Sequence, residues 1–188
     1  MQPKPVRRMA LLGGESSGKT TLARALAAQL STVWVPEYGR QRWEELRETL
    51  SADELLQVAR RQVEWEEEQA LKARGWLVCD TSPLTTLQYC LFDHGQAPSE
   101  LHTLAQRHYD LTVVCLPDFD FVQDGCRRDD TFRAQQHAWT MARLAEMRVV
   151  PLLVSGPEPA RLSQVLTHLA QLEPAGNNIQ TPQPVSLR

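Results

Sequence analysis

The sequence predicts an α/β fold in which a parallel sheet of five strands is covered by helices on both faces. Three observations lead to this prediction. Short apolar runs alternate along the chain with segments of helical periodicity, as they do in proteins built round a parallel sheet. These runs are continuously apolar, which is typical of strands that are buried on both faces. The first run leads directly into a glycine-rich stretch and then a helix, which is the order found in phosphate-binding loops.

The glycine-rich stretch at residues 13–20 reads G-G-E-S-S-G-K-T and fits the pattern G-x-x-x-x-G-K-T. Glycines let the backbone wrap closely round an anion, and the helix that follows adds the positive end of its dipole. Lys19 is expected to contact the β- and γ-phosphates of ATP, and the hydroxyl of Thr20 to bind Mg²⁺. The sequence therefore predicts a P-loop NTPase with ATP and Mg²⁺ as cofactors. The residues predicted to bind ATP here are Gly13, Gly14, Glu15, Ser16, Ser17, Gly18, Lys19, Thr20 and Thr21.

The other elements follow in chain order. Ser51 and Glu54 have the spacing of a capping box, which predicts the start of a long helix. Gly75 is expected to end this helix in a left-handed conformation. Apolar runs predict strands at residues 6–12, 33–36, 76–79, 111–116 and 149–154. Helical spacing predicts helices at about residues 19–30, 39–50, 51–74, 83–92, 99–109, 131–147 and 162–169.

Length and composition indicate an ordinary globular protein. The 188 residues suit one domain, expected at residues 1–172, while residues 173–188 are rich in Pro, Asn and Gln and are expected to be disordered. A net charge of −3 gives no overall attraction to nucleic acid, and no stretch is long and apolar enough to span a membrane. The four cysteines form no C-x-x-C pair, so free thiols in a reducing cytoplasm are expected. The oligomeric state is not predicted.

Two carboxylates stand at the ends of predicted strands, where ligands bind in parallel α/β sheets. Asp80 is expected to face Thr20 across the loop and hold Mg²⁺. The alternative for Asp80 is a helix N-cap, since a Thr-Ser-Pro sequence follows it. Glu37 is placed to accept the proton of a hydroxyl that attacks the γ-phosphate. The alternative for Glu37 is a surface residue paired with Arg40 or Arg42.

Further binding residues are expected on either side of these carboxylates. Tyr38 and Trp43 could stack on a flat base, with ordinary packing as the alternative. The polar segment at about residues 118–131 is predicted to form a lid over the phosphates. Arg127 is the first candidate there to neutralise charge during phosphoryl transfer, and Arg128 is the second. The alternative is a solvated loop with internal Arg–Asp pairs.

Together these residues resemble the ribosylnicotinamide kinase domain of NadR-like NAD-salvage proteins. The resemblance covers about residues 6–172 and rests on the P-loop, E-Y-G-R at residues 37–40, D-T at 80–81 and D-G-x-R at 124–127. It implies a fold of the nucleoside and nucleotide kinase group with a lid. It also implies transfer of the γ-phosphate of ATP to the 5′-hydroxyl of nicotinamide riboside, which gives nicotinamide mononucleotide. The implied catalytic residues are Lys19, Glu37, Asp80 and Arg127, the implied substrate-binding residues are Glu37, Tyr38, Arg40 and Trp43, and Arg128 would contact ATP.

The chain departs from that family in two respects. Bifunctional members carry an adenylyltransferase domain with an H-x-G-H motif, which is not found in this sequence, and some members have a second Asp where this chain has Ser82. In addition, V-P-E after the second strand and D-x-S after the third are similar to deoxynucleoside kinases, in which the strand-end Glu is the base. Two alternatives therefore stay open. One is a kinase for another nucleoside or small metabolite, and the other is an ATP-binding regulatory switch.

Overall fold

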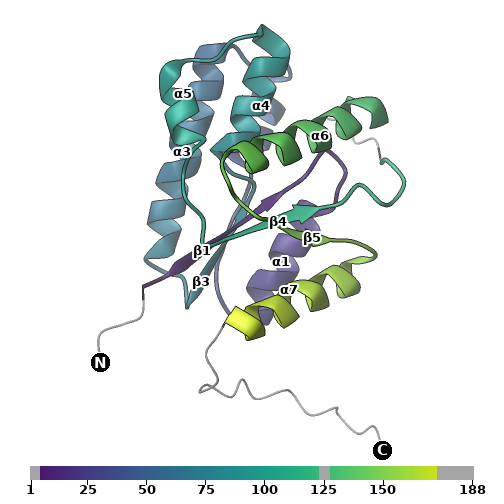
Figure 1. Cartoon of the computed structure of the whole chain (residues 1–188). Helices are drawn as coiled ribbons and strands as arrows, with labels where there is room; N and C mark the ends of the chain where they lie inside the picture. The colour runs from purple at the N-terminus through teal and green to yellow at the C-terminus, as the bar shows by residue number, and fades with distance from the viewer. Residues whose placement is uncertain (1–4, 123–127, 173–188) are drawn as a thin grey trace, which may run out of the picture.

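The computed structural model describes residues 5–122 and 128–172 and confirms the predicted parallel sheet (Figure 1). All neighbouring strands run parallel, and their order across the sheet is β2-β3-β1-β4-β5. The P-loop follows β1, so it lies at the middle of the sheet. The strands are β1 (Arg7–Leu12), β2 (Trp34–Val35), β3 (Trp76–Asp80), β4 (Leu111–Cys115) and β5 (Leu152–Val154).

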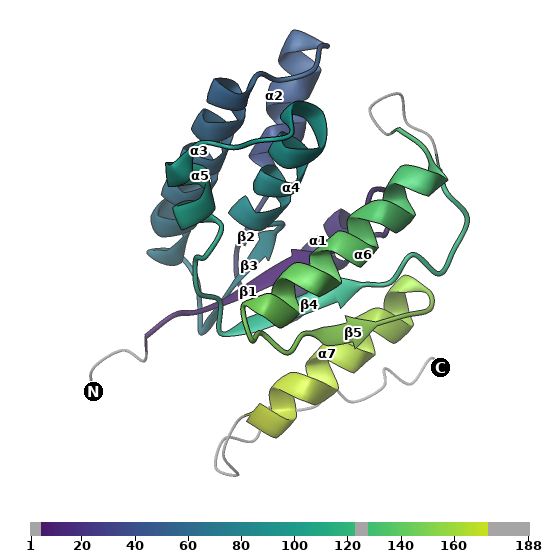
Figure 2. The same cartoon turned by 45° about the horizontal axis from the view of Figure 1, so that its top comes forward.

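Helices cover both faces of the sheet, as Figures 1 and 2 show. The alternation of side chains along β1 explains why, because Met9 and Leu11 point to one face while Ala10 and Leu12 point to the other. The first face packs against α1 (Lys19–Gln29) and α7 (Glu158–Leu172). The second face packs against α3 (Ala52–Ala70), α4 (Pro83–His94), α5 (Ser99–Leu104) and α6 (Asp130–Glu146). The short helix α2 (Tyr38–Leu46) packs on α3 beyond the edge strand β2.

Local signals in the sequence place some helix ends and miss others. The capping box is confirmed, since Ser51 Oγ accepts from the Glu54 N–H and Glu54 accepts from the Ser51 N–H. However, α3 ends at Ala70 rather than Arg74, and Gly75 takes its left-handed φ of +73° in the turn into β3. Other elements are also shorter than predicted, among them α2, which ends at Leu46, and β2, which has two residues. Helix α5 ends at Leu104, and β5 begins only after Pro151, which has no N–H to donate.

Several predictions concern residues at the limits of the described structure. The predicted disordered tail at 173–188 lies outside the described residues, as do residues 123–127 of the predicted lid. Cys79, Cys90 and Cys115 are buried free thiols, as predicted, while Cys126 lies in the segment that is not described. Among the described helices, none has the length and apolar character needed to cross a membrane.

A buried cluster of charged residues joins α3 to the sheet at the edge where β1 and β4 begin. Glu66 is completely buried and accepts hydrogen bonds from Arg107 Nε at 2.7 Å and from the Tyr109 hydroxyl at 2.9 Å. Arg107 also pairs with Glu67, which accepts in turn from Arg8 at the start of β1. This cluster fixes the segment before β4 against α3, on the side of the sheet away from the P-loop.

Candidate active site

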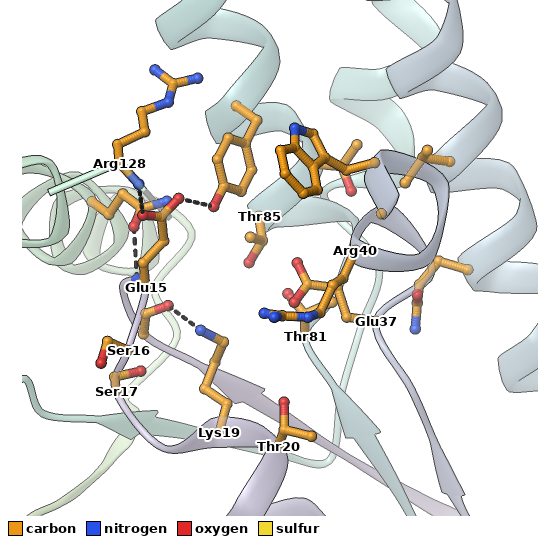
Figure 3. A pocket seen from close by; sticks show the side chains of 18 of the residues that line it. Glu15, Ser16, Ser17, Lys19, Thr20, Glu37, Arg40, Thr81, Thr85 and Arg128 are labelled. Carbon is orange, nitrogen blue, oxygen red and sulfur yellow. Dashed lines mark hydrogen bonds between the residues drawn. The ribbon is translucent and has the colours of Figure 1, made fainter. Parts of the chain in front are cut away.

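The cavity that holds the predicted site residues lies at the carboxyl ends of the strands. Its volume is about 360 Å³, and it opens between the P-loop, the start of α2, the inner faces of α3 and α4, and the start of α6 (Figure 3). Parallel α/β sheets bind ligands at this edge because strand ends and helix N-termini converge there. The P-loop supplies one wall, and the helices supply the opposite wall.

The backbone of the P-loop adopts a conformation that its glycines make possible. Gly13 has a φ of +140°, and a Cβ at this position would lie 2.6 Å from the carbonyl oxygen of Cys115. Lys19 folds back over the loop, where its Nζ donates to the carbonyl oxygens of Gly13 and Gly14 at 2.9 Å each. The buried hydroxyl of Ser17 makes no hydrogen bond with any part of the chain that the structure describes. A glycine-containing loop after a strand, with a lysine ammonium folded over it and a helix starting behind it, fits the triphosphate of ATP.

Two buried arginines support the loop from behind. Arg161 on α7 donates to the carbonyl oxygens of Ser17 at 2.7 Å, Leu116 at 2.8 Å and Gly156 at 2.6 Å, and it pairs with Asp118.

Arg133 on α6 donates to the carbonyl oxygen of Phe119 at 2.9 Å. Gly14 packs against this arginine, since a Cβ on Gly14 would lie 2.7 Å from the Arg133 carbonyl oxygen. Of the loop residues predicted to bind ATP, Gly14 packs against α6 and is not part of the cavity lining, whereas the others line the cavity. Arg161 and Arg133 tie the loop to the ends of β4 and β5.

Thr20 and Asp80 meet as predicted at the floor of the site. The Thr20 hydroxyl donates to Asp80 Oδ2 at 2.6 Å, while Asp80 Oδ1 is buried and has no hydrogen-bond partner within residues 5–122 and 128–172. Burial raises the pKa of Asp80, and its hydrogen bond with Thr20 and the charge of Lys19 act in the opposite direction. Ser82, not Asp80, caps α4, because its Oγ accepts from the Leu84 N–H. This finding removes the helix-cap alternative for Asp80.

A hydroxyl and an aspartate with a spare oxygen fit the chemistry of Mg²⁺. Mg²⁺ is usually held by one or two protein oxygens together with phosphate oxygens and water. The residues present would hold Mg²⁺ through Thr20 and Asp80.

Glu37 stands at the N-terminus of α2 and lines the cavity. Burial is the main cause that raises the pKa of this carboxyl, and the negative charges of Asp80 and Glu15 raise it further, while Lys19 and Arg40 lower it. Arg40 also lines the cavity, and Figure 3 shows its side chain beside that of Glu37.

Arg42, the other partner that the surface alternative proposed for Glu37, pairs with Glu45 at 2.9 Å. Glu37 thus lines the cavity instead of pairing with Arg42, and its pKa is raised.

The two aromatic residues predicted to stack on a base have different positions. Trp43 lines the cavity together with the apolar residues Leu50, Leu55 and Val58. Tyr38 does not contribute to this lining, because its ring packs edge-on against Trp65 with the ring centroids 5.0 Å apart. The structure therefore corrects the prediction for Tyr38, which belongs to the packing between α2 and α3.

The second lid arginine lines the cavity, but its side chain makes contacts away from the P-loop. The guanidinium of Arg128 pairs with Asp93 on α4 and lies 4.2 Å from the ring centroid of Phe132. Its backbone N–H reaches the P-loop, where it donates to Glu15 at 2.7 Å. In Figure 3 the side chain points away from Lys19 and the loop. Arg127, the predicted catalytic arginine, lies outside the described residues.

Glu15 joins the two walls of the cavity. One carboxylate oxygen accepts from the Tyr89 hydroxyl on α4 at 2.8 Å, and the other accepts from the Arg128 N–H at the start of α6. The Glu15 N–H in turn donates to the side chain of Gln136 on α6 at 2.8 Å. Sequence reasoning placed Glu15 in the P-loop without this bridging role, which depends on residues far away in the chain.

Sequence reasoning also missed two polar residues of the cavity wall. Gln62 on α3 is buried, and its Oε1 accepts from the Tyr38 N–H at 3.0 Å, while its Nε2 has no partner among the residues described. Thr81 also lines the cavity, and its hydroxyl has no hydrogen-bond partner among the residues that the structure describes. Only Thr81 carried a sequence signal, as the second residue of the D-T pair.

Comparison with known proteins agrees with this site. A family model described as an AAA domain (AAA_28) matches residues 8–161. The trifunctional NAD biosynthesis/regulator protein NadR of Escherichia coli (strain K12) is 29% identical over 135 residues, which are 68% of this chain and 32% of that protein. The chain therefore spans about a third of the length of this curated relative.

Solved structures of similar fold include NadR and a deoxynucleoside kinase. A NadR structure in complex with NR has a TM-score of 0.73 at 20% identity and covers 92% of this chain and 54% of that chain. A second NadR structure, in complex with NAD and AMP-PNP, has a TM-score of 0.70 at 18% identity, with coverages of 87% and 49%. Deoxyadenosine kinase from M. mycoides has a TM-score of 0.58 at 9% identity, with coverages of 88% and 100%.

These neighbours share the P-loop fold of nucleoside and nucleotide kinases, which confirms the predicted fold class. The matched region includes the whole P-loop, Glu37, Asp80 and all four helices that enclose the cavity, α2, α3, α4 and α6. By this match over most of its length, the chain belongs to the AAA-domain family of P-loop proteins.

Proposed function

We propose that the chain is an ATP-dependent kinase that transfers the γ-phosphate of ATP to the 5′-hydroxyl of nicotinamide riboside. One observation supports transfer rather than simple nucleotide binding: Glu37 lines the same cavity as Lys19 and Thr20, the residues fitted to the triphosphate. A carboxylate in that position, with a raised pKa, suits a base for an acceptor hydroxyl.

Each residue has a distinct part in the proposed reaction. Lys19 and the P-loop N–H groups hold the phosphates, and Thr20 and Asp80 hold Mg²⁺, which neutralises phosphate charge when it is bound. Glu37 orients the acceptor hydroxyl and takes its proton as the new oxygen–phosphorus bond forms. The bond between the γ-phosphorus and the bridging oxygen breaks, and its electron pair leaves with ADP. The products are ADP and the phosphorylated nucleoside.

The cavity wall on the α2 and α3 side is suited to a flat acceptor. Trp43 lines this wall together with Leu50, Leu55 and Val58, and a ring with positive charge is attracted to an aromatic ring. The nicotinamide ring of nicotinamide riboside carries that charge. The similarity to NadR, including a structure in complex with NR, supports the same acceptor.

A second acceptor class is supported by the similarity to deoxyadenosine kinase. Both alternatives use the same phosphate loop and base, and they differ only in the nucleoside that occupies the wall formed by α2, α3 and α4.

A coupled assay of ADP release with Mg²⁺ and ATP tests both proposals. We expect turnover with nicotinamide riboside and a rate at least tenfold lower with cytidine, uridine, adenosine and the deoxynucleosides, a ratio that corresponds to about 1.4 kcal/mol. Faster turnover with a deoxynucleoside would favour the second acceptor class. A rate no higher than the background without acceptor, for every nucleoside, would refute the kinase and leave an ATP-binding switch. A Lys19→Ala preparation shows how much ADP release comes from contaminating enzymes.

A further inference from the structure

Thr81 has the least favourable backbone conformation of the non-glycine residues near the site. Its φ is +86°, whereas the other non-glycine residues with positive φ in the described ranges, among them Ser16 and Arg148, have values from 51° to 58°. Those values lie in the left-handed helical well, and +86° does not. Thr81 is in addition the single β-branched residue of this group within the described structure. A β-branched side chain in this region is a rare and strained case.

The turn from β3 into α4 does not explain the choice of threonine. The Thr81 N–H donates to the carbonyl oxygen of Leu11 at 3.1 Å, and this bond needs no side chain. The helix that follows is capped by Ser82 and begins at Pro83. Glycine would adopt the same φ without a steric penalty, and asparagine with a smaller one. The strain is therefore associated with the threonine side chain itself.

That side chain is buried against the cavity with its hydroxyl unsatisfied. Thr81 is 3% exposed and lines the cavity, and its Oγ1 has no hydrogen-bond partner in residues 5–122 or 128–172. An unpaired buried hydroxyl is a second energetic cost at the same residue. The positive φ and the unpaired hydroxyl both destabilise the fold, and no contact within the described structure explains them. We take this as an indication that the hydroxyl is used when a ligand is bound.

The surroundings identify the part of the ligand that it would meet. Thr81 directly follows Asp80, which holds Thr20, and it shares the cavity wall with Glu37 and Thr85 (Figure 3). This is the place where the reacting end of a phosphoryl acceptor must lie if Glu37 is the base.

We propose that Thr81 positions the reacting hydroxyl of the acceptor, donating its own O–H to the oxygen whose proton Glu37 removes. This role rests on the proposed kinase function and extends it to a residue that contacts the acceptor and not the nucleotide.

Replacement by glycine separates the two properties of Thr81. Thr81→Gly removes both the strain and the unpaired hydroxyl, so we expect the melting temperature to rise. We also expect kcat/KM for nicotinamide riboside to fall by about tenfold or more, the effect of one lost hydrogen bond of about 1.4 kcal/mol, while KM for ATP stays within about twofold. Thr81→Ser, which keeps the hydroxyl, is expected to retain most of the activity.

Arg148→Gly is the matched control. Arg148 is exposed and has a left-handed φ of +57° at the end of α6, away from the cavity lining. This variant is expected to raise the melting temperature without any change in kinetics.

The possible outcomes are distinguishable. If the wild-type protein phosphorylates a nucleoside and Thr81→Gly does so with equal kcat/KM, the role of Thr81 is wrong while the kinase proposal stands. If the KM for ATP of Thr81→Gly rises by the same factor by which its kcat/KM for nicotinamide riboside falls, the phosphate loop itself is disturbed. That result would also overturn the role of Thr81. If the wild-type protein phosphorylates no nucleoside, the kinase proposal fails, and the role of Thr81 fails with it.

Discussion

Replacing Arg161 by methionine removes the charged group that ties the P-loop to the far strands while keeping much of the side-chain volume. Arg161 is 2% exposed, and its loss leaves the carbonyl oxygens of Ser17, Leu116 and Gly156 without their donor and Asp118 without its ion-pair partner. Breaking a buried pair costs about 3–5 kcal/mol. Since the Asp118 side chain is 29% exposed and can regain water, we expect about 3 kcal/mol, the lower end of that range.

For a domain of this size, that loss corresponds to a melting temperature lower by about 6–12 °C. Thermal unfolding followed by calorimetry measures it. The control is Arg143→Met, which removes an ion pair with Glu146 whose side chains are 33% and 64% exposed. Such a pair contributes at most about 1 kcal/mol, so this variant should lose less than about 4 °C. A decrease for Arg161→Met no larger than that of the control would refute the view that this residue anchors the loop.

The remaining predictions concern the reaction and the buried charge cluster. Glu37→Gln is expected to lower kcat by about 10²–10⁴ with little change in KM for ATP; an unchanged kcat would exclude Glu37 as the base. Because burial raises the pKa of Glu37 and the base acts in its deprotonated form, wild-type activity should increase with pH through a pKa above that of an ordinary glutamate. The Gln variant should lack this limb. Lys19→Ala is expected to abolish phosphate transfer, and residual turnover near the wild-type rate would contradict the P-loop assignment. Arg107→Ala should lower the free energy of unfolding by about 3–5 kcal/mol at pH 7, because it leaves Glu66 buried and charged. Burial already raises the folded-state pKa of Glu66 above the unfolded value. The stability lost in Arg107→Ala should therefore be smaller at lower pH, where Glu66 takes up a proton in the folded state. Denaturant unfolding at pH 5 and pH 7 measures this loss at each pH, and an equal loss at both would contradict the prediction.

The sequence predicts the fold and the phosphate side of the site well because their signals are local. The P-loop residues are contiguous, and the pairing of Thr20 with Asp80 follows from the rule that strand ends share one edge of the sheet. The long helix α3 shows the limit of such signals. Its start is fixed by a capping box within four residues, but its end at Ala70 depends on where β3 must begin, and Gly75 serves the turn instead.

The acceptor side is harder to predict because its contacts join distant parts of the chain. Tyr38 faces Trp65 instead of the cavity since the rotation of α2 is set by its packing on α3. Glu15 meets Tyr89 and Arg128 only after α4 and α6 have packed over the sheet. Gln62 lies on α3, whose sequence is that of an ordinary amphipathic helix. No local pattern in the sequence indicates that its side chain lines the cavity.

The bridge made by Glu15 has a thermodynamic consequence. Its carboxylate belongs to the phosphate loop and accepts hydrogen bonds from the opposite wall. A ligand that shifts one wall is therefore expected to change the affinity of the other wall for its own ligand. Equilibrium linkage requires such an influence to be mutual: whatever factor a bound nucleoside applies to the dissociation constant of ATP, ATP applies to that of the nucleoside. Any preferred order in which the two substrates enter would then be a matter of rates alone. Glu15→Gln keeps one acceptor oxygen in place of two, so it should change that coupling factor, and the change should be equal whether it is measured on the dissociation constant of ATP or on that of the nucleoside.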